Sequence, residues 1–398
     1  MSVQWGIELL KSAGLFFLHP LFWFFIIISL AFGYVRIKRE RKTFHTRIAD
    51  IYDDLKFTYT KGLIPGLLLS VVLGVLGISV PLGLLAIIAV ITAAAALTLR
   101  ANWMSAAYIV SVSMLICFGL QMYQAEPFLE RFPQGFAVVW PAMGVFLGLL
   151  IIIEGAVAYR SAHVRTSPAL VVSSRGLPIG QQLANRIWLL PLFLLVPGNG
   201  LESHLSWWPV FTVPGGSFHF LWIPYFVGFG QRVQGSLPET SIRITAKRVC
   251  ILGLAVTVLG AASLLWTPLA GAAVCVAVLG RIFLSIKQRV NDNAAPFYFS
   301  KRDQGLMVLG IIPNTPAEDL ELKIGEIITK VNGIPVKNVS DFYEALQHNR
   351  AYVKLEIIGL NGEIRFDQRA SYEGEHHELG ILFVKDDRED EAAALSGS

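Results

Sequence analysis

Long runs of apolar residues, separated by short polar segments, fill about the first three quarters of the chain. A helix needs about 20 consecutive apolar residues to cross the hydrocarbon layer of a membrane. The pattern therefore predicts a polytopic helical membrane domain over residues 1–290. Its clear candidate spans are 15–35, 63–80, 82–99, 103–121, 136–158, 249–266 and 269–284.

A further apolar stretch, 187–230, is interrupted by prolines. Broken helices are tolerated in a membrane where the surrounding protein buries the freed backbone groups. The stretch is therefore interpreted either as two kinked spans or as one span with a re-entrant segment, which gives eight or nine spans in total. The prolines are Pro191, Pro197, Pro209, Pro214 and Pro224.

Lysine and arginine residues are concentrated in alternate connections between the predicted spans. The segments 36–62, 159–186 and 231–248 are basic, whereas 198–206 carries no Lys or Arg. Basic connections stay on the cytoplasmic side of a membrane. If 187–230 crosses twice, the alternation places the N-terminus outside the cell and the C-terminal region in the cytoplasm.

The most basic connection directly follows the first predicted span. Clusters of Lys and Arg just inside a membrane attract anionic lipid. The same cluster could instead dock an acidic partner, or serve only to fix the topology. This basic segment consists of Arg36, Lys38, Arg39, Arg41, Lys42 and Arg47.

Ionisable residues inside the predicted spans are scarce, and such residues mark transport pathways when they occur. Glu154 is the only acidic residue well inside a predicted span, and it lies one to two turns from Arg160. We expect Glu154 to pair with this local arginine, and Arg281 to reach the membrane interface. The membrane half therefore offers little support for an ion path.

Beyond residue 296 the pattern changes to short alternating strands separated by turn residues. Thr315 followed by Pro316 and Glu318 predicts a helix start with a capping box. The prediction is a small mixed α/β barrel over residues 291–385, followed by an acidic, Ala- and Ser-containing tail, 386–398, that we expect to be disordered. Strands are predicted at 305–312, 326–331, 352–358 and 363–368, and a second helix at 341–347.

Composition agrees with this division into two parts. Hydrophobic residues make up 54% of the chain and charged residues 16%, against about 25% charged residues in soluble proteins. Residues 1–296 carry 22 basic and 11 acidic side chains, whereas 297–398 carry 11 basic and 18 acidic ones. These numbers exclude a wholly soluble protein, and we expect no nucleic-acid partner.

Motifs for catalysis and metal binding are missing from the sequence. The three cysteines lie in or beside apolar runs and form no Cys-x-x-Cys or Cys/His cluster. His376, His377 and Glu378 lack the helical spacing of a zinc protease motif, and no Gly-x-Ser-x-Gly occurs. We therefore expect a non-enzymatic protein with no catalytic residues, no metal and no cofactor.

The C-terminal motifs resemble those of bacterial PDZ domains. The match runs from Gly305 through Pro316-Ala317 to Val331-Asn332-Gly333, with Glu326 where the family prefers Asp. Residues 320–322 read Leu-Glu-Leu where the family prefers Ala-Gly-Leu. The resemblance implies a domain that binds a peptide as an added strand beside a helix, with backbone N–H groups of a loop holding a carboxylate.

No such loop precedes Gly305, so a permuted domain would place it before the last strand. If the loop holds a carboxylate, a side chain at Gly380 should weaken binding in a domain that stays folded. In the alternative interpretation, 379–384 is only a closing strand and the partner binds elsewhere. The candidate binding residues are Leu379, Gly380 and Ile381 in the loop, and Phe342, Ala345 and Leu346 on the groove helix.

A long proline-interrupted polytopic region followed by one PDZ domain, without a protease motif, resembles the topological determinants of the Gram-positive Min system. The resemblance covers the whole chain in length and layout. It implies a non-enzymatic scaffold that links a DivIVA-like polar scaffold to the ATPase MinD. MinC is thereby held near poles and completed septa, where FtsZ assembly is blocked.

The same resemblance implies a multi-pass protein of the cell membrane, enriched at septa and poles, with its C-terminus in the cytoplasm. Membrane lipid and other septal membrane proteins are further implied partners, and an oligomer is left open. The residues themselves leave two alternatives: a transporter or channel with a regulatory PDZ domain, or a PDZ adaptor that recruits a membrane protease.

Overall fold

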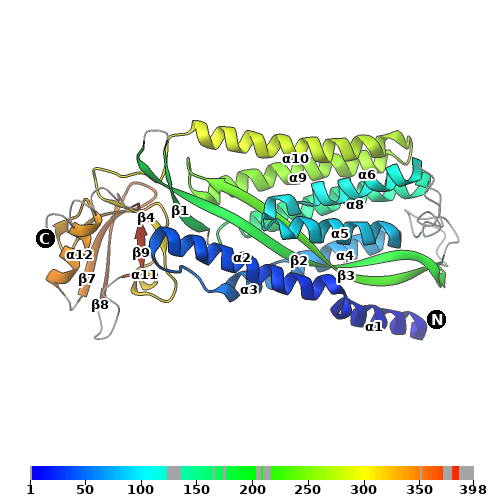
Figure 1. Cartoon of the computed structure of the whole chain (residues 1–398), viewed down its shortest axis with the longest axis horizontal. Helices are drawn as coiled ribbons and strands as arrows, with labels where there is room; N and C mark the ends of the chain where they lie inside the picture. The colour runs from blue at the N-terminus through cyan, green and yellow to red at the C-terminus, as the bar shows by residue number, and fades with distance from the viewer. Residues whose placement is uncertain are drawn as a thin grey trace.

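The computed structural model describes residues 2–122, 136–164, 166–173, 176–202, 208, 217–349, 352–370 and 379–384. Helices and two long strands run along the long axis of the molecule, and a small sheet domain lies at the end that carries the C-terminus (Figure 1). The predicted fold class, a helical membrane region followed by a PDZ-like α/β domain, is confirmed. The predicted tail, 386–398, lies outside the described residues.

Among the described residues, five helical stretches are long and apolar enough to cross a membrane: 20–44, 51–76, 139–160, 238–262 and 268–294. Two shorter apolar helices, 82–97 and 106–122, accompany them. The helices are α1 (Ser2–Leu18), α2 (Pro20–Phe44), α3 (Ile51–Lys61), α4 (Leu63–Leu76), α5 (Leu82–Leu97), η1 (Ala101–Met104), α6 (Ala106–Met122), α8 (Phe136–Arg160), α9 (Pro238–Ala262) and α10 (Pro268–Ala294).

The first predicted span, 15–35, is divided between two helices. The backbone of His19 is extended, and its Nδ1 accepts a hydrogen bond from the backbone N–H of Leu21. Pro20 occupies the first position of α2, where its missing N–H costs no helical hydrogen bond. The spanning helix therefore begins at Pro20 and continues to Phe44, so it includes most of the basic segment.

The helical interpretation of 187–230 is wrong. The described parts of this stretch belong to two long antiparallel strands, β2 (Pro178–Glu202) and β3 (Ser217–Val233), which pair from Gln182 with Val233 to Val196 with His219. β1 (Ser167–Val172) pairs with the start of β2 and completes a three-stranded sheet. The expected total of eight or nine helical spans included this stretch, so that total is not supported.

The outer edge of β2 is covered by the neighbouring helices. The Oγ of Ser70 on α4 donates to the carbonyl of Pro191 at 2.8 Å and accepts from the N–H of Phe193 at 2.9 Å. The N–H of Val80 donates to the carbonyl of Leu195 at 2.9 Å. A membrane offers no water to an open sheet edge. These hydrogen bonds therefore allow a strand to lie among the helices.

The prolines fit this hairpin because of the direction of their nitrogen atoms. Pro191 lies directly opposite Pro224. Two residues further on, the N–H of Phe193 points out of the pair toward Ser70, so the nitrogen of Pro191 faces the same outer edge. Proline is tolerated at an edge because it has no N–H to donate. Gly66 lets α4 approach, since a Cβ there would lie 2.5 Å from Cδ of Pro191.

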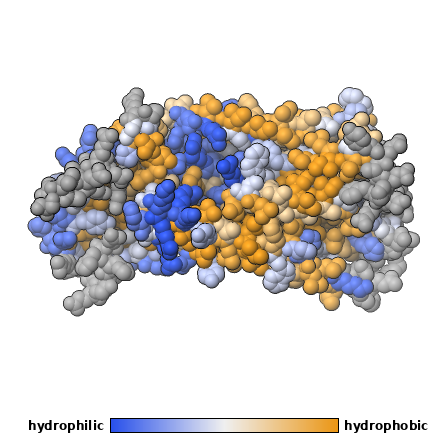
Figure 2. All heavy atoms as spheres, in the orientation of Figure 1, coloured by the Kyte–Doolittle hydropathy of each residue, from blue (hydrophilic) through white to orange (hydrophobic). Residues whose placement is uncertain are grey.

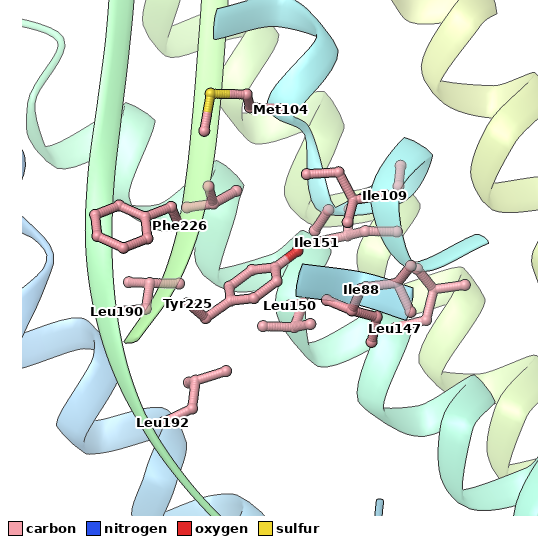
Figure 3. Close-up of a cluster of buried hydrophobic side chains, with 14 of the residues drawn as sticks. Ile88, Met104, Ile109, Leu147, Leu150, Ile151, Leu190, Leu192, Tyr225 and Phe226 are labelled. Carbon is pink, nitrogen blue, oxygen red and sulfur yellow. The ribbon is translucent and has the colours of Figure 1, made fainter. Parts of the chain in front are cut away.

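Side chains of the hairpin enter the core of the helical bundle. Figure 3 shows Tyr225 of β3 pointing toward Leu150 and Ile151 of α8. Phe226, the next residue, stacks on Phe25 of α2 with ring centroids 3.7 Å apart. All five side chains are buried. The hairpin is thus an internal part of the membrane region.

The C-terminal domain is an antiparallel sheet with the strand order β8-β7-β5-β4-β9, flanked by two helices. Its Asn332-Gly333 pair has positive φ angles of 51° and 86° and forms the tight turn between β5 and β6. The elements are β4 (Leu306–Ile311), α11 (Pro316–Asp319), β5 (Ile327–Val331), β6 (Ile334–Pro335), α12 (Val339–His348), β7 (Tyr352–Ile358), β8 (Ile364–Ala370) and β9 (Ile381–Phe383).

This domain packs directly on the end of the membrane region. The N–H of Gly180 donates to the carbonyl of Phe299 at 2.8 Å, and Nε2 of Gln182 donates to the carbonyl of Leu309 at 2.6 Å. An apolar cluster surrounds these two bonds, so the domain is held against α2 and the β1–β2 strands. The cluster contains Phe44, Ile48, Leu170, Phe299, Met307, Leu309 and Leu382.

Candidate functional site

The structure brings the two predicted halves of the peptide groove together. β9 pairs with β4 and forms one edge of the sheet in the described part of the domain. The ring of Phe383 on β9 contacts that of Phe342 on α12 edge-to-face, with centroids 5.0 Å apart. A free strand edge beside a helix is the arrangement that PDZ domains use to bind a peptide.

The loop before β9 is fixed by hydrogen bonds from residues near the start of the domain sequence. The carbonyl of Leu379 accepts from the N–H of Ala317 at 2.9 Å, and the carbonyl of Gly380 accepts from the N–H of Ile312 at 2.8 Å. Gly380 has a φ of 83°, and a Cβ there would lie 2.5 Å from Cβ of Thr315. A side chain at Gly380 would therefore disturb the fold, contrary to the expectation that the domain stays intact.

The six candidate residues differ in how accessible they are. Leu379, Gly380, Ile381, Phe342 and Ala345 are buried in the domain, and Leu346 is half-buried. The segment 379–383 therefore has two roles. Its side chains pack in the core as those of a closing strand do, and its backbone forms an edge of the sheet. Of the six, Leu346 is the side chain that a partner can reach with the least change in the core.

The basic segment is divided by the structure into an inward and an outward set. Arg36 donates to Asp54 at 2.9 Å, to both carboxylate oxygens of Glu40 at 3.1 Å, and to two carbonyls of the turn before α3. Arg39 donates to Oγ of Ser167 on β1 at 2.8 Å. Lys38, Arg41, Lys42 and Arg47 are exposed.

Glu40 and Asp54 were not singled out by sequence reasoning, although they hold the inward arginines. Glu40 is buried, and it also accepts from Oγ of Ser167 and from the N–H of Ile48. The spacing of Arg36 and Glu40, one helical turn apart, is the signal that could have indicated the ion pair. Pairing with Asp54 additionally requires the α2–α3 turn, which the sequence pattern does not specify.

Glu154 pairs with Arg281, not with Arg160. The carboxylate accepts from Nη2 of Arg281 at 3.0 Å, from Oγ of Ser105 at 2.7 Å and from the N–H of Ala106 at 2.9 Å. The side chains of Glu154 and Arg281 are 0% and 2% exposed. The expectation that Arg281 reaches the interface is therefore wrong, and this pair joins α8, α10 and the start of α6.

Comparison with known proteins identifies the C-terminal domain and then the whole chain. A family model described as PDZ domain matches residues 307–358. Over 398 residues, the chain is 96% identical to "Cell division topological determinant MinJ" of Bacillus subtilis (strain 168), covering 100% of both proteins. The chain belongs to the MinJ family. Members of this family are cell division topological determinants.

The similarity to more distant MinJ relatives also covers almost the whole chain. "Probable cell division topological determinant MinJ" of Lacticaseibacillus paracasei is 22% identical over 370 residues, which cover 92% of this chain and 95% of that protein. A protein of Lacticaseibacillus casei (strain BD-II) with the same name matches with the same identity and coverage. The MinJ similarity therefore includes both the membrane region and the PDZ domain.

Proposed function

We propose that this protein is a non-enzymatic membrane scaffold for division-site selection. It would link a DivIVA-like polar scaffold to MinD, so that MinC blocks FtsZ assembly near poles and completed septa. The observation that carries the proposal is the full-length similarity to MinJ. The two partners themselves come from the resemblance of the sequence to Min-system determinants.

The packing of the PDZ domain supports a scaffold role. Gln182 and the apolar cluster around Phe299 fix the domain to the membrane region, so a partner bound beside β9 and α12 would be held at the membrane surface. A flexible tether would only raise the local concentration of a partner. A domain docked in one orientation also fixes the direction in which the partner is presented.

Glu154 gives no support to the transporter or channel alternative. Its carboxylate is already committed to Arg281, Ser105 and the backbone of Ala106. A transport site needs an ionisable group that can exchange its partner for an ion or a proton. The residue that sequence analysis offered for that role is thus accounted for by structural bonds.

We expect the C-terminus to be cytoplasmic. The β2–β3 hairpin begins and ends at the same end of the bundle, since Gln182 pairs with Val233. It can therefore make the two crossings that the alternation of basic segments requires. Green fluorescent protein fused after Val384 should fluoresce, and alkaline phosphatase fused there should be inactive. Active phosphatase together with a dark fluorescent fusion would contradict this orientation and the cytoplasmic adaptor role.

The localisation of the protein in dividing cells tests the proposed function. A fluorescent fusion of the full chain should replace the native copy in a rod-shaped Gram-positive cell. We expect enrichment at septa and poles over the lateral membrane, measured relative to a general membrane dye. Uniform signal, in cells whose length shows that the fusion is functional, would contradict a scaffold for division-site selection.

A further inference from the structure

A cavity of about 450 Å³ lies between the C-terminal part of α2, α3, the segment after α8 and the start of β2. Its volume is within the range of small-molecule sites, about 300–1,000 Å³. Apolar side chains form one wall and charged groups another. The residues that matter for the argument are Phe32, Val35, Phe57, Arg36, Arg39 and Arg186.

The cavity lies where the lipid-facing surface of the protein ends. Val35 lines the cavity and is 44% exposed, and the preceding residue, Tyr34, is exposed as well. One helical position later the basic segment begins with Arg36. In Figure 2 the apolar surface of the helical region gives way to polar surface near the C-terminal end of α2. The cavity is thus accessible from the membrane interface.

Arg39 carries hydrogen-bond donors that no carboxylate of the described residues accepts, although the lining arginines (Arg36, Arg39 and Arg186) are matched in number by Glu40, Asp53 and Asp54. Arg36 takes the carboxylates of Glu40 and Asp54, and Glu40 also accepts from Ser167 and Ile48. Arg39 donates through Nη2 to the uncharged hydroxyl of Ser167. Its Nε is buried and, within the described residues, has no hydrogen-bond partner. A buried cationic donor without a partner is costly, and it favours an anionic ligand.

A second guanidinium lies at the same cavity. Arg186 donates to the carbonyls of Ser161 and Val164 and lies over the ring of Phe57, 5.7 Å from its centroid. Arginine is well suited to phosphate because its planar donors match the geometry of the oxygens. The cavity therefore combines arginine donors with an apolar wall, at the end of α2 where the basic segment begins.

We propose that this cavity binds the phosphate of an anionic membrane phospholipid, with Arg39 as the principal ligand. The acyl chains would leave the cavity past Val35 and lie along α2. The apolar wall and the opening beside lipid-facing surface favour a lipid over a soluble phosphate compound. The site would anchor the α2–α3 turn in the membrane interface, directly beneath the PDZ domain.

Binding can be measured on the purified full chain in detergent, with three probes that separate the contributions. Dioleoyl phosphatidylglycerol carries phosphate and acyl chains, dioleoylglycerol carries only the chains, and glycerol 3-phosphate carries only the headgroup. We expect the phospholipid to raise the unfolding temperature and to be retained in native mass spectra. The other two probes should bind at least about tenfold more weakly, since each lacks one set of contacts.

The variant Arg39→Gln should lower the affinity for phosphatidylglycerol by about tenfold, because a charged hydrogen-bonding group is lost. Lys287→Gln, which removes an exposed charge of α10 away from the cavity, is the matched control and should bind as the wild type does. Val35→Trp should weaken binding by filling the mouth while leaving Arg39 in place. If Arg39→Gln does not fold, Val35→Trp tests whether the lipid binds in this cavity.

Three outcomes would overturn the proposal. Equal binding of dioleoylglycerol would make the cavity an apolar site without phosphate recognition. Glycerol 3-phosphate bound as tightly as the lipid would make it a site for a soluble phosphate. Wild-type lipid affinity in folded Arg39→Gln or Val35→Trp protein would show that the lipid does not bind in this cavity.

Discussion

Replacing Arg281 by Met is expected to lower the free energy of unfolding of the membrane region by about 3–5 kcal/mol, because removal of one partner leaves the other charge buried. Glu154 would keep its bonds to Ser105 and Ala106 but would lose the only positive charge that the structure places in contact with its carboxylate among the described residues. Unfolding of the full chain in mixed micelles, followed by tryptophan fluorescence, measures the loss.

The double variant Glu154→Gln/Arg281→Met is the control for this result. Glutamine can still accept from Ser105 and Ala106, and no charge then remains buried. Replacing a whole buried ion pair by neutral groups is often close to neutral in stability. We therefore expect the double variant to be more stable than Arg281→Met alone. A double variant at least as unstable as the sum of the two single ones would contradict the assigned pairing.

The substitution Phe342→Ala should lower the stability of the PDZ domain by about 3–5 kcal/mol, the usual cost of emptying a buried aromatic site. Phe342 is 1% exposed and contacts Phe383 of β9, so the cavity would open between the helix and the edge strand. Native-state hydrogen exchange at Leu355, a buried residue of β7, reports the free energy of domain opening in the full chain.

The matched control is Leu346→Ala on the same helix. Leu346 is half-buried, and less surface is lost, so the domain should lose about 1 kcal/mol or less. Equal losses for the two variants would mean that α12 packs on the sheet through a different face. The burial assigned to the predicted groove residues would then be wrong.

Local signals in the sequence were sufficient to predict the PDZ domain and most of the helices. Pro316-Ala317 and Asn332-Gly333 fix turns within a few residues, and runs such as 249–266 exceed what a short strand needs. The β2–β3 hairpin was missed because an apolar run buried on both sides has no alternation to separate strand from helix. The useful signal was the aromatic and β-branched content of 218–229.

The candidate site was predictable only in part, for a similar reason. The resemblance to PDZ domains predicted that Phe342 and Ile381 lie close together, and both belong to one apolar cluster; their role in a peptide groove stays a prediction. The inward direction of Arg36 and Arg39, in contrast, depends on the α2–α3 turn and on β1, which begins more than 120 residues later in the chain. Arg281 and Glu154 are 127 residues apart, and no local pattern connects them.

Recruitment of MinD in living cells tests the central claim, that this chain links the membrane to the division inhibitor through its PDZ domain. The comparison uses wild type, Leu346→Asp and the matched control Gln347→Asp, an exposed neighbour on α12. Provided that hydrogen exchange at Leu355 shows the domain still folded, Leu346→Asp should reduce the septal signal of fluorescent MinD by about tenfold, and Gln347→Asp should retain it. Undiminished MinD at septa in cells that carry folded Leu346→Asp protein would contradict the account.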